Sequence, residues 1–240
     1  MRFVTWNMNY WIRNKQQRKL AWSYLFDELD PDIALLQEAK IQTLNLDNYN
    51  IIYHKLDGRR DWGSIIVAKN YRLFEHLIKN YYPGSRGLIA AEAQVSENIR
   101  ITVINIYGQI DPDGYATTTL HHMLSDLTPI LHKEGKKKFI VLGGDFNISK
   151  QWDEKYKNRD PLHKLVFDRL EDFGLVNCTG IFYGGHIKTY THRRGNFPWQ
   201  TDYLFVSSNL KERIKFCEVI SSEEINELSD HSPILLELDL

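Results

Sequence analysis

The feature that most constrains the fold of this 240-residue chain is an apolar strand that runs directly into polar groups. The stretch Phe139-Ile-Val-Leu-Gly-Gly-Asp145-Phe146-Asn147 begins with apolar and mostly β-branched or aromatic residues, which is typical of a buried strand. We predict that the two glycines turn the chain sharply at the end of this strand. If extended geometry persists beyond them, the side chains of Asp145 and Asn147 point the same way. The stretch is therefore either a strand-to-loop turn or part of a catalytic site, because a carboxylate can take a proton from water beside a carboxamide donor.

Other apolar strands predicted from the sequence also have polar side chains at their ends. The strand 33–38 ends in Glu38, and Asp230-His231 precedes the final strand 233–238. The residues in such positions are Asn7, Glu38, Tyr107, Asp145, Asn147, Asp202, Asp230 and His231. Each has an ordinary alternative, such as a turn-forming Asn or a salt bridge between Glu38 and Lys40. Because all eight fall at the ends of buried strands, we expect them to converge on one site.

The strand 101–107 supplies two polar side chains. Asn105 and Tyr107 are two residues apart, so they share one face of this strand. A tyrosine hydroxyl at the mouth of a site can hydrogen-bond a phosphate oxygen. The alternative is an ordinary strand tyrosine that packs its ring in the core.

Four carboxylates in one cleft repel one another unless a cation balances them, so the convergence predicts a divalent metal ion. Carboxylate and amide oxygens without cysteine are ligands for Mg²⁺ or Mn²⁺. The two cysteines, Cys178 and Cys217, form no disulfide framework and no zinc spacing, and we interpret them as buried thiols in a reducing compartment.

Composition limits the partners. The net charge is −1, whereas proteins that bind the phosphate backbone of nucleic acid without regard to sequence are usually basic. Nucleic-acid binding is therefore less expected from the overall charge, although a local basic patch would be enough for it. Such a patch is predicted at Arg193 and Arg194, and Trp199 follows in the same loop as a side chain that can stack on a base. No apolar run is long enough for a membrane span and no signal segment precedes the first strand, so we expect a cytoplasmic monomer.

Amphipathic helices are predicted at 15–29, 115–131 and 161–173, and they alternate irregularly with strands. Asn14 is a suitable N-cap for the first helix, and Asp30-Pro31 ends it. With no repeat or linker, this pattern favours a layered α/β body, and we expect residues 1–240 to form a single domain.

Six segments resemble the endonuclease/exonuclease/phosphatase superfamily, which is typified by exonuclease III, abasic-site endonucleases and DNase I. They are Thr5-Trp6-Asn7, Leu36-Gln37-Glu38, Asn105-Ile-Tyr107, Gly143-Gly-Asp145-Phe-Asn147, Thr201-Asp202-Tyr203-Leu-Phe-Val and Ser229-Asp230-His231-Ser-Pro. They occur in the order of the family and cover nearly the whole chain. The resemblance implies a DNase I-like four-layer α/β/β/α sandwich, with two packed mixed sheets flanked by helices, and metal-dependent hydrolysis of phosphoesters.

The resemblance also implies a metal site and a base. Glu38 would be the principal ligand of Mg²⁺ or Mn²⁺, with Asn7 and Asp230 close to the same ion. Asn9 is similar to a family position near the metal. Asp145 would orient or deprotonate the attacking water.

The remaining motif residues would handle the phosphate. Asn147 and Tyr107 would hold the scissile phosphate. Asn105 belongs to the Asn105-Ile-Tyr107 motif and would also contact the substrate. His231 would bind the phosphate and stabilise its charge, with Asp202 fixing the imidazole ring.

Two departures from the repair enzymes disfavour specificity for abasic sites. Gly108-Gln109-Ile110 replaces their Pro-Asn turn, and the loop 192–199 looks shorter and more basic than theirs. The sequence thus favours a magnesium-dependent nuclease acting on DNA or RNA. The alternatives are a hydrolase of a small or lipid phosphoester, of the phosphoinositide or sphingomyelin type, and a binding module with an inactive site.

Overall fold

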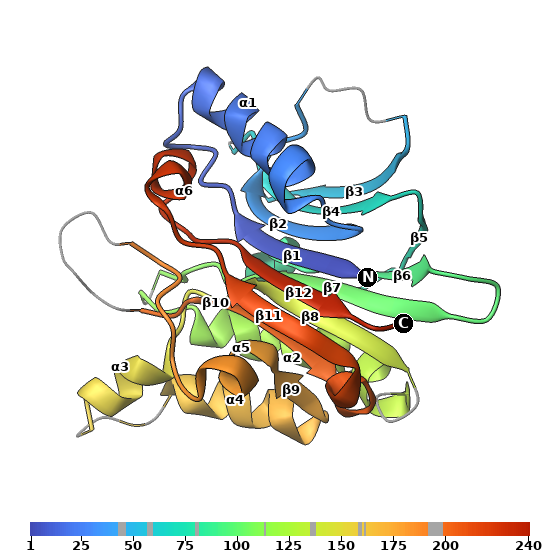
Figure 1. Ribbon diagram of the computed structural model, residues 1–240. Helices are drawn as coiled ribbons and strands as arrows, with labels where there is room; N and C mark the ends of the chain where they lie inside the picture. The colour runs from blue at the N-terminus through green and yellow to red at the C-terminus, as the bar shows by residue number, and fades with distance from the viewer. Residues whose placement is uncertain are drawn as a thin grey trace.

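The structure, a computed structural model, describes residues 1–42, 47–56, 60–79, 82–112, 114–134, 138–157, 160, 162–191 and 199–240. Two six-stranded mixed sheets pack face to face, and helices cover their outer faces (Figure 1). This arrangement confirms the predicted four-layer α/β/β/α sandwich. Among the described helices, none combines the length and the hydropathy that a bilayer span requires.

The first sheet contains the N-terminal and C-terminal strands of the chain. Its order is β11 (Ile214–Val219), β12 (Ile234–Leu238), β1 (Arg2–Asn7), β2 (Ile33–Ala39), β4 (Gly63–Lys69) and β3 (Tyr49–Lys55). β1 is parallel to β2 and antiparallel to β12. The carboxyl ends of β1 and β2 therefore lie at the same edge as the start of β12.

The second sheet carries the central strand. Its order is β5 (Arg72–Glu75), β6 (Ile89–Gln94), β7 (Arg100–Tyr107), β8 (Phe139–Asp145), β10 (Asp202–Ser207) and β9 (Leu175–Asn177). Parallel pairing of β7 with β8 places Tyr107 opposite Asp145, and antiparallel pairing of β8 with β10 places Asp202 opposite Asp145. One end of this sheet therefore gathers three of the predicted site residues.

Apolar layers hold the sandwich together. The central core lies between the sheets, with Leu35 from β2 and Val103 from β7 among its fully buried residues. On the outer face of the first sheet lie α1 (Lys15–Ser23), the π-helical segment Tyr24–Leu29 and α6 (Glu223–Leu228). On the outer face of the second sheet lie α2 (Thr117–Glu134) and α4 (Leu162–Asp172). The shorter elements are α3 (Lys150–Lys155), α5 (Cys178–Tyr183) and the 3₁₀ segments Pro83–Gly87 and Ser208–Arg213.

Both chain ends lie at the edge of the sandwich opposite the carboxyl end of β1 (Figure 1). The terminal amino group of Met1 donates to the carbonyl of Leu238 at 2.6 Å. The strand ends that carry the polar residues are therefore at the other edge, where the loops of both sheets meet.

The predicted first helix is confirmed in position, and Asn14 forms a capping box with Gln17. Its last turns are π-helical, and it ends at Asp30, whose φ of 41° is left-handed. The predicted turn at the two glycines of the central strand is wrong, because β8 continues through both of them to Asp145. A Cβ on Gly144 would lie 1.8 Å from the carbonyl oxygen of Ile106, so this glycine permits the close approach of β7 and β8.

Candidate active site

A cavity of about 590 Å³ opens at the edge where the strand ends of both sheets meet. Polar side chains line it at Asn9, Glu38, Asp145, Asn147, Asp230 and His231, and further lining comes from Tyr10, Trp11, Arg60, Asp61, Trp62, Tyr107, Ile110 and Tyr190. The polar set comes from segments that are far apart in the chain. The fold therefore assembles around one cavity six of the eight residues that the sequence places at separate strand ends.

Asp145 is the most deeply buried acid of the cavity, with no exposed surface. The amide of Asn7 donates to Asp145 Oδ2 at 2.9 Å. Asn147 donates twice to the same carboxylate, from its backbone N–H to Oδ1 at 2.9 Å and from Nδ2 to Oδ2 at 3.1 Å. Asn147 reaches back through a left-handed backbone with φ of 51°, a conformation that Asn tolerates better than most residues. Burial raises the pKa of Asp145 to about 7, although His231 opposes this shift.

His231 and Asp202 form a buried pair. His231 Nδ1 lies 2.9 Å from Asp202 Oδ2, and the hydroxyl of Thr201 donates to that oxygen at 3.0 Å. The backbone around His231 is fixed by Ser229, whose Oγ accepts from its N–H, and by Trp6, whose indole donates to its carbonyl. Burial lowers the pKa of His231, but the carboxylates of Asp202 and Asp145 outweigh that effect and raise it to about 10. The imidazole is therefore protonated at neutral pH.

Glu38 lines the same cavity from the end of β2. The hydroxyl of Tyr107 donates to Glu38 Oε1 at 2.9 Å, which connects β7 of one sheet to β2 of the other. A register shift between Leu36 and Ala39 and a left-handed φ of 45° at Glu38 mark a bulge there. Burial raises the pKa of Glu38 above its usual range, although His231 and the bond from Tyr107 oppose this. The carboxylate therefore lacks full compensation from the protein.

Asp230 completes the group of acids. Asn9 Nδ2 donates to Asp230 Oδ1 at 2.5 Å, and the backbone N–H of Asn9 donates to Asn7 Oδ1 at 2.9 Å. Asn7 thus connects two parts of the site, because its amide nitrogen holds Asp145 while its amide oxygen holds the loop of Asn9. The three amides keep the carboxylates in fixed positions without adding charge.

One cluster of possible metal ligands stands out by distance. Single donor atoms of Asp145, Asp202 and His231 all lie within 4.8 Å of one another. Within this cluster His231 Nδ1 and Asp202 Oδ2 already pair with each other at 2.9 Å. The carboxylates of Glu38 and Asp230 line the same cavity, and their hard oxygens suit a divalent cation.

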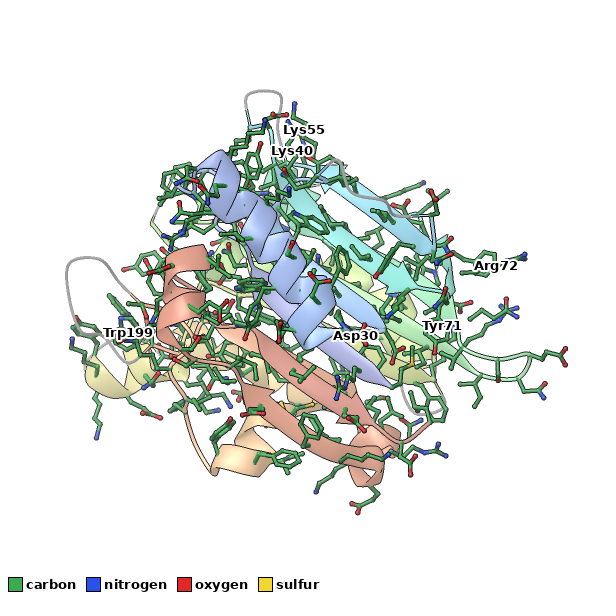
Figure 2. The ribbon with its side chains drawn as sticks, turned by 45° about the horizontal axis from the view of Figure 1, so that its top comes forward. Asp30, Lys40, Lys55, Tyr71, Arg72 and Trp199 are labelled. Carbon is green, nitrogen blue, oxygen red and sulfur yellow. The ribbon has the colours of Figure 1, made fainter. Side chains whose placement is uncertain are left out.

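Six of the eight strand-end residues line the cavity together with Asn9, and the other two, Asn7 and Asp202, each hydrogen-bond to one that does. Two of the other predicted contacts lie elsewhere. Asn105 is fully buried between the sheets, so it does not reach the cavity. Trp199 lies beside α3 (Figure 2), where its ring is 6.0 Å from that of Trp152. Arg193 and Arg194 lie outside the described residues. Lys40 forms an ion pair with Asp61 instead of Glu38, which removes the salt-bridge alternative for that acid.

Sequence reasoning missed two kinds of residue. The first kind positions the pair of Asp202 and His231: the hydroxyl of Thr189 accepts from the backbone N–H of Asp202 at 3.1 Å, and no strand pattern marks this threonine. The second kind forms apolar lining of the cavity, at the buried Trp62 and at the exposed Trp11 and Ile110. Trp11 and Ile110 follow strand-end motifs within four residues, so proximity to a motif is the signal that could have found them.

Comparison with known proteins gives a family and a fold. The model of the endonuclease/exonuclease/phosphatase family matches residues 4–231. An exodeoxyribonuclease from Bacillus subtilis is 25% identical over 264 residues and is aligned over 100% of both chains. An AP endonuclease from Archaeoglobus fulgidus has a similar structure, with a TM-score of 0.78, 19% identity and 100% of both chains covered. A 3'-5' exonuclease from Neisseria meningitidis has a TM-score of 0.74 and 20% identity, again over 100% of both chains.

Proposed function

Because this chain belongs to the endonuclease/exonuclease/phosphatase family, we propose that it is a divalent-metal-dependent phosphodiester hydrolase that cleaves DNA or RNA. The observation that carries the proposal is the lining of one cavity by Asp145, by His231 with its partner Asp202, and by Glu38 with Tyr107. An acid near neutral pKa, a protonated imidazole and hard oxygen donors in one cavity are the groups that water attack on a phosphodiester requires. The kinship to an exodeoxyribonuclease supports nucleic acid as the substrate.

The residues around Glu38 fit Mg²⁺ or Mn²⁺. Glu38 and Asp230 offer carboxylate oxygens and Asn7 is an amide neighbour, so the donors are the hard oxygens that these ions prefer. The raised pKa of Glu38 fits the same assignment, since a carboxylate that is buried without enough positive charge is poised to bind a cation. A bound divalent ion would supply positive charge to the phosphoryl oxygens. In our proposal Glu38, Asp230 and Asn7 hold it.

Asp145 is proposed as the base that takes the proton from the attacking water. Its pKa of about 7 places proton transfer near neutral pH, where a general base is most effective. The donors from Asn7 and Asn147 fix the orientation of the carboxylate. Asn147 Nδ2 also donates to the carbonyl of Gly108 at 3.1 Å, and in our proposal it exchanges one of its two bonds for an oxygen of the scissile phosphate when substrate enters the cavity.

His231 is proposed as the group that stabilises charge on the phosphate. Asp202 occupies Nδ1, which leaves Nε2 for a phosphate oxygen. Because the imidazole carries a positive charge, it opposes the negative charge that grows during in-line attack. Tyr107 lines the cavity beside Glu38, and in our proposal its single hydroxyl proton turns from Glu38 Oε1 to the phosphate when substrate binds.

The alternative is a hydrolase of a small or lipid phosphoester, of the phosphoinositide or sphingomyelin type. The net charge of −1 favours it, since most proteins that bind nucleic acid through the backbone are more basic. We extend the proposal to a monomer in the cytoplasm, which size-exclusion chromatography and cell fractionation would check.

The test is a substrate panel with purified protein. Labelled single-stranded and duplex oligonucleotides, sphingomyelin and a phosphoinositide are incubated with Mg²⁺, with Mn²⁺ and with a chelator. Metal-dependent cleavage of an oligonucleotide supports the proposal, whereas turnover of a lipid alone supports the alternative. Asp145→Asn should lower kcat at least about a hundredfold, while Asp168→Asn, which changes a surface partner of Lys164, should leave it unchanged.

A further inference from the structure

Two large apolar side chains remain exposed at the rim of the catalytic cavity. Trp11 is 60% exposed and Ile110 is 61% exposed, and both line the cavity. Trp11 follows β1 of the first sheet, two residues after Asn9. Ile110 follows β7 of the second sheet, three residues after Tyr107. The two sheets thus each place an apolar side chain beside the polar floor of the same cavity.

We propose, on the basis of the nuclease activity proposed above, that Trp11 and Ile110 form a clamp for one unpaired nucleobase next to the scissile phosphate. A base has flat apolar faces, and stacking on a tryptophan holds it without regard to sequence. A base that lies against side chains has left the stack of its own strand. The preferred substrate is therefore a single strand or a frayed end.

The aromatic rim is unsuited to a quaternary ammonium such as choline. An aromatic cage binds such a cation with the negative faces of its rings. Here protein cations already lie over two of the rings, with the Arg18 guanidinium 3.7 Å from the ring centre of Tyr10 and the Arg60 guanidinium 5.1 Å from that of Trp62. A ligand cation would meet these positive charges, whereas a neutral base would not.

The charges of the cavity also disfavour a polyphosphorylated headgroup. Among the described lining residues, the acids are Glu38, Asp61, Asp145 and Asp230, and the cations are Arg60 and His231. His231 is assigned to the scissile phosphate, so few positive groups are left for further phosphates. A nucleotide brings one phosphate and one apolar ring to the site, which matches this lining.

The experiment uses single-stranded oligonucleotides in which one nucleotide at a time is replaced by a base-free tetrahydrofuran spacer. Cleavage positions and kcat/KM are measured for the wild type and for Trp11→Ala. With the wild type, a spacer at a nucleotide adjoining the cleaved phosphate should lower kcat/KM about tenfold. Trp11→Ala should lower kcat/KM by about the same factor on the ordinary oligonucleotide. On the spacer substrate Trp11→Ala should cause no further loss of kcat/KM, because the base and the tryptophan ring act through one shared contact.

Matched variants separate the clamp from general surface effects. Trp11→Phe keeps an aromatic face and should retain most of the activity, and Ile110→Ala should behave as Trp11→Ala but more weakly. Phe74→Ala removes an aromatic side chain that is 48% exposed on β5, away from the cavity, and should change nothing. Thermal unfolding of each variant verifies that it is folded.

Several outcomes would overturn the clamp while leaving the nuclease in place. One is that the factors by which Trp11→Ala and the spacer lower kcat/KM multiply when both are present, which would show that they act independently. The others are faster cleavage at the spacer and equal kcat/KM for wild type and Trp11→Ala. Turnover of p-nitrophenylphosphorylcholine that depends on Trp11 would assign the rim to a quaternary ammonium and would also overturn it. Absence of any metal-dependent cleavage of the oligonucleotides would instead refute the nuclease proposal itself.

Discussion

Replacement of Asn105 by leucine tests whether this residue binds substrate or joins the two sheets. Its Nδ2 donates to the carbonyls of Leu36 at 2.8 Å and of Ile65 at 2.9 Å, both in the opposite sheet. Its Oδ1 accepts from Gln37 Nε2 at 2.7 Å. Asn105 is fully buried, so no water can replace these partners when the amide is removed. Asn105→Leu keeps the number and branching of the side-chain heavy atoms and removes three hydrogen bonds.

The expected cost follows from those three bonds. A buried hydrogen bond contributes about 1 kcal/mol net, so the free energy of unfolding should fall by about 3 kcal/mol. In a chain of this size a loss of 1 kcal/mol lowers Tm by roughly 2–4 °C. We therefore expect Tm of Asn105→Leu to fall by about 6–12 °C.

Circular dichroism in a chelator gives Tm, and cleavage of an oligonucleotide well below the midpoint gives kcat/KM. Asn50→Leu on β3 is the control, because Asn50 is an exposed asparagine in a strand of the first sheet, and its Tm should stay within about 1 °C of wild type. If Asn105→Leu keeps the wild-type Tm but loses activity, Asn105 is a substrate ligand and the structural role is refuted.

Three further predictions probe the metal site, the imidazolium and the central strand. Glu38→Gln should raise the Mg²⁺ concentration for half-maximal protection against thermal unfolding roughly tenfold or more, because the principal charged ligand is lost; an unaltered titration by calorimetry would contradict ligation by Glu38. The folded pKa of His231, about 10, lies above the ordinary value of 6.5. Its contribution to stability should therefore be complete below about pH 6.5 and be lost as the pH rises toward 10, so that Tm in a chelator falls over this window and falls less in His231→Gln. Gly144→Ala should lower the free energy of unfolding by roughly 3 kcal/mol or more, because φ is 150° and the added Cβ would overlap the carbonyl of Ile106. Gly185→Ala, with open space around it, is the control, and equal denaturant midpoints for the two variants would show that β7 and β8 can move apart at no cost.

The sequence predicted which strands end in polar groups but not how deep each group lies. Asn105 and Tyr107 do share a face, as the two-residue period requires, and both side chains bond to the first sheet. Two residues of strand correspond to about 7 Å along the sheet, however. That distance separates the interior of the sandwich from its open edge, and no local pattern encodes where the edge is.

The two glycines of the central strand show a second limit. Glycine favours turns in a single sequence, so a turn was the natural expectation. What requires glycine here lies on neighbouring strands: a Cβ on Gly143 would be 2.5 Å from Leu204 Cδ2, and one on Gly144 would meet Ile106. Contacts of this kind depend on which strands become neighbours, and the strand order of a mixed sheet is set by the whole chain.

Backbone strain and amide donors together explain how several acids are kept in one cavity. Among the described residues, positive φ outside glycine occurs at Asn9, Asp30, Glu38, Asn70 and Asn147, and three of these belong to the site. Such conformations cost of order 1 kcal/mol or more each and persist only where the surroundings enforce them. At Asn9 and Asn147 the enforcing contacts are hydrogen bonds to Asp230 and Asp145. The amides therefore fix the directions of the carboxylates but leave their charge uncompensated, which is why burial still raises the pKa of Glu38 and Asp145. In our proposal, this order without compensating charge prepares the site for a cation and a phosphate, and the backbone strain is the local cost of that preparation.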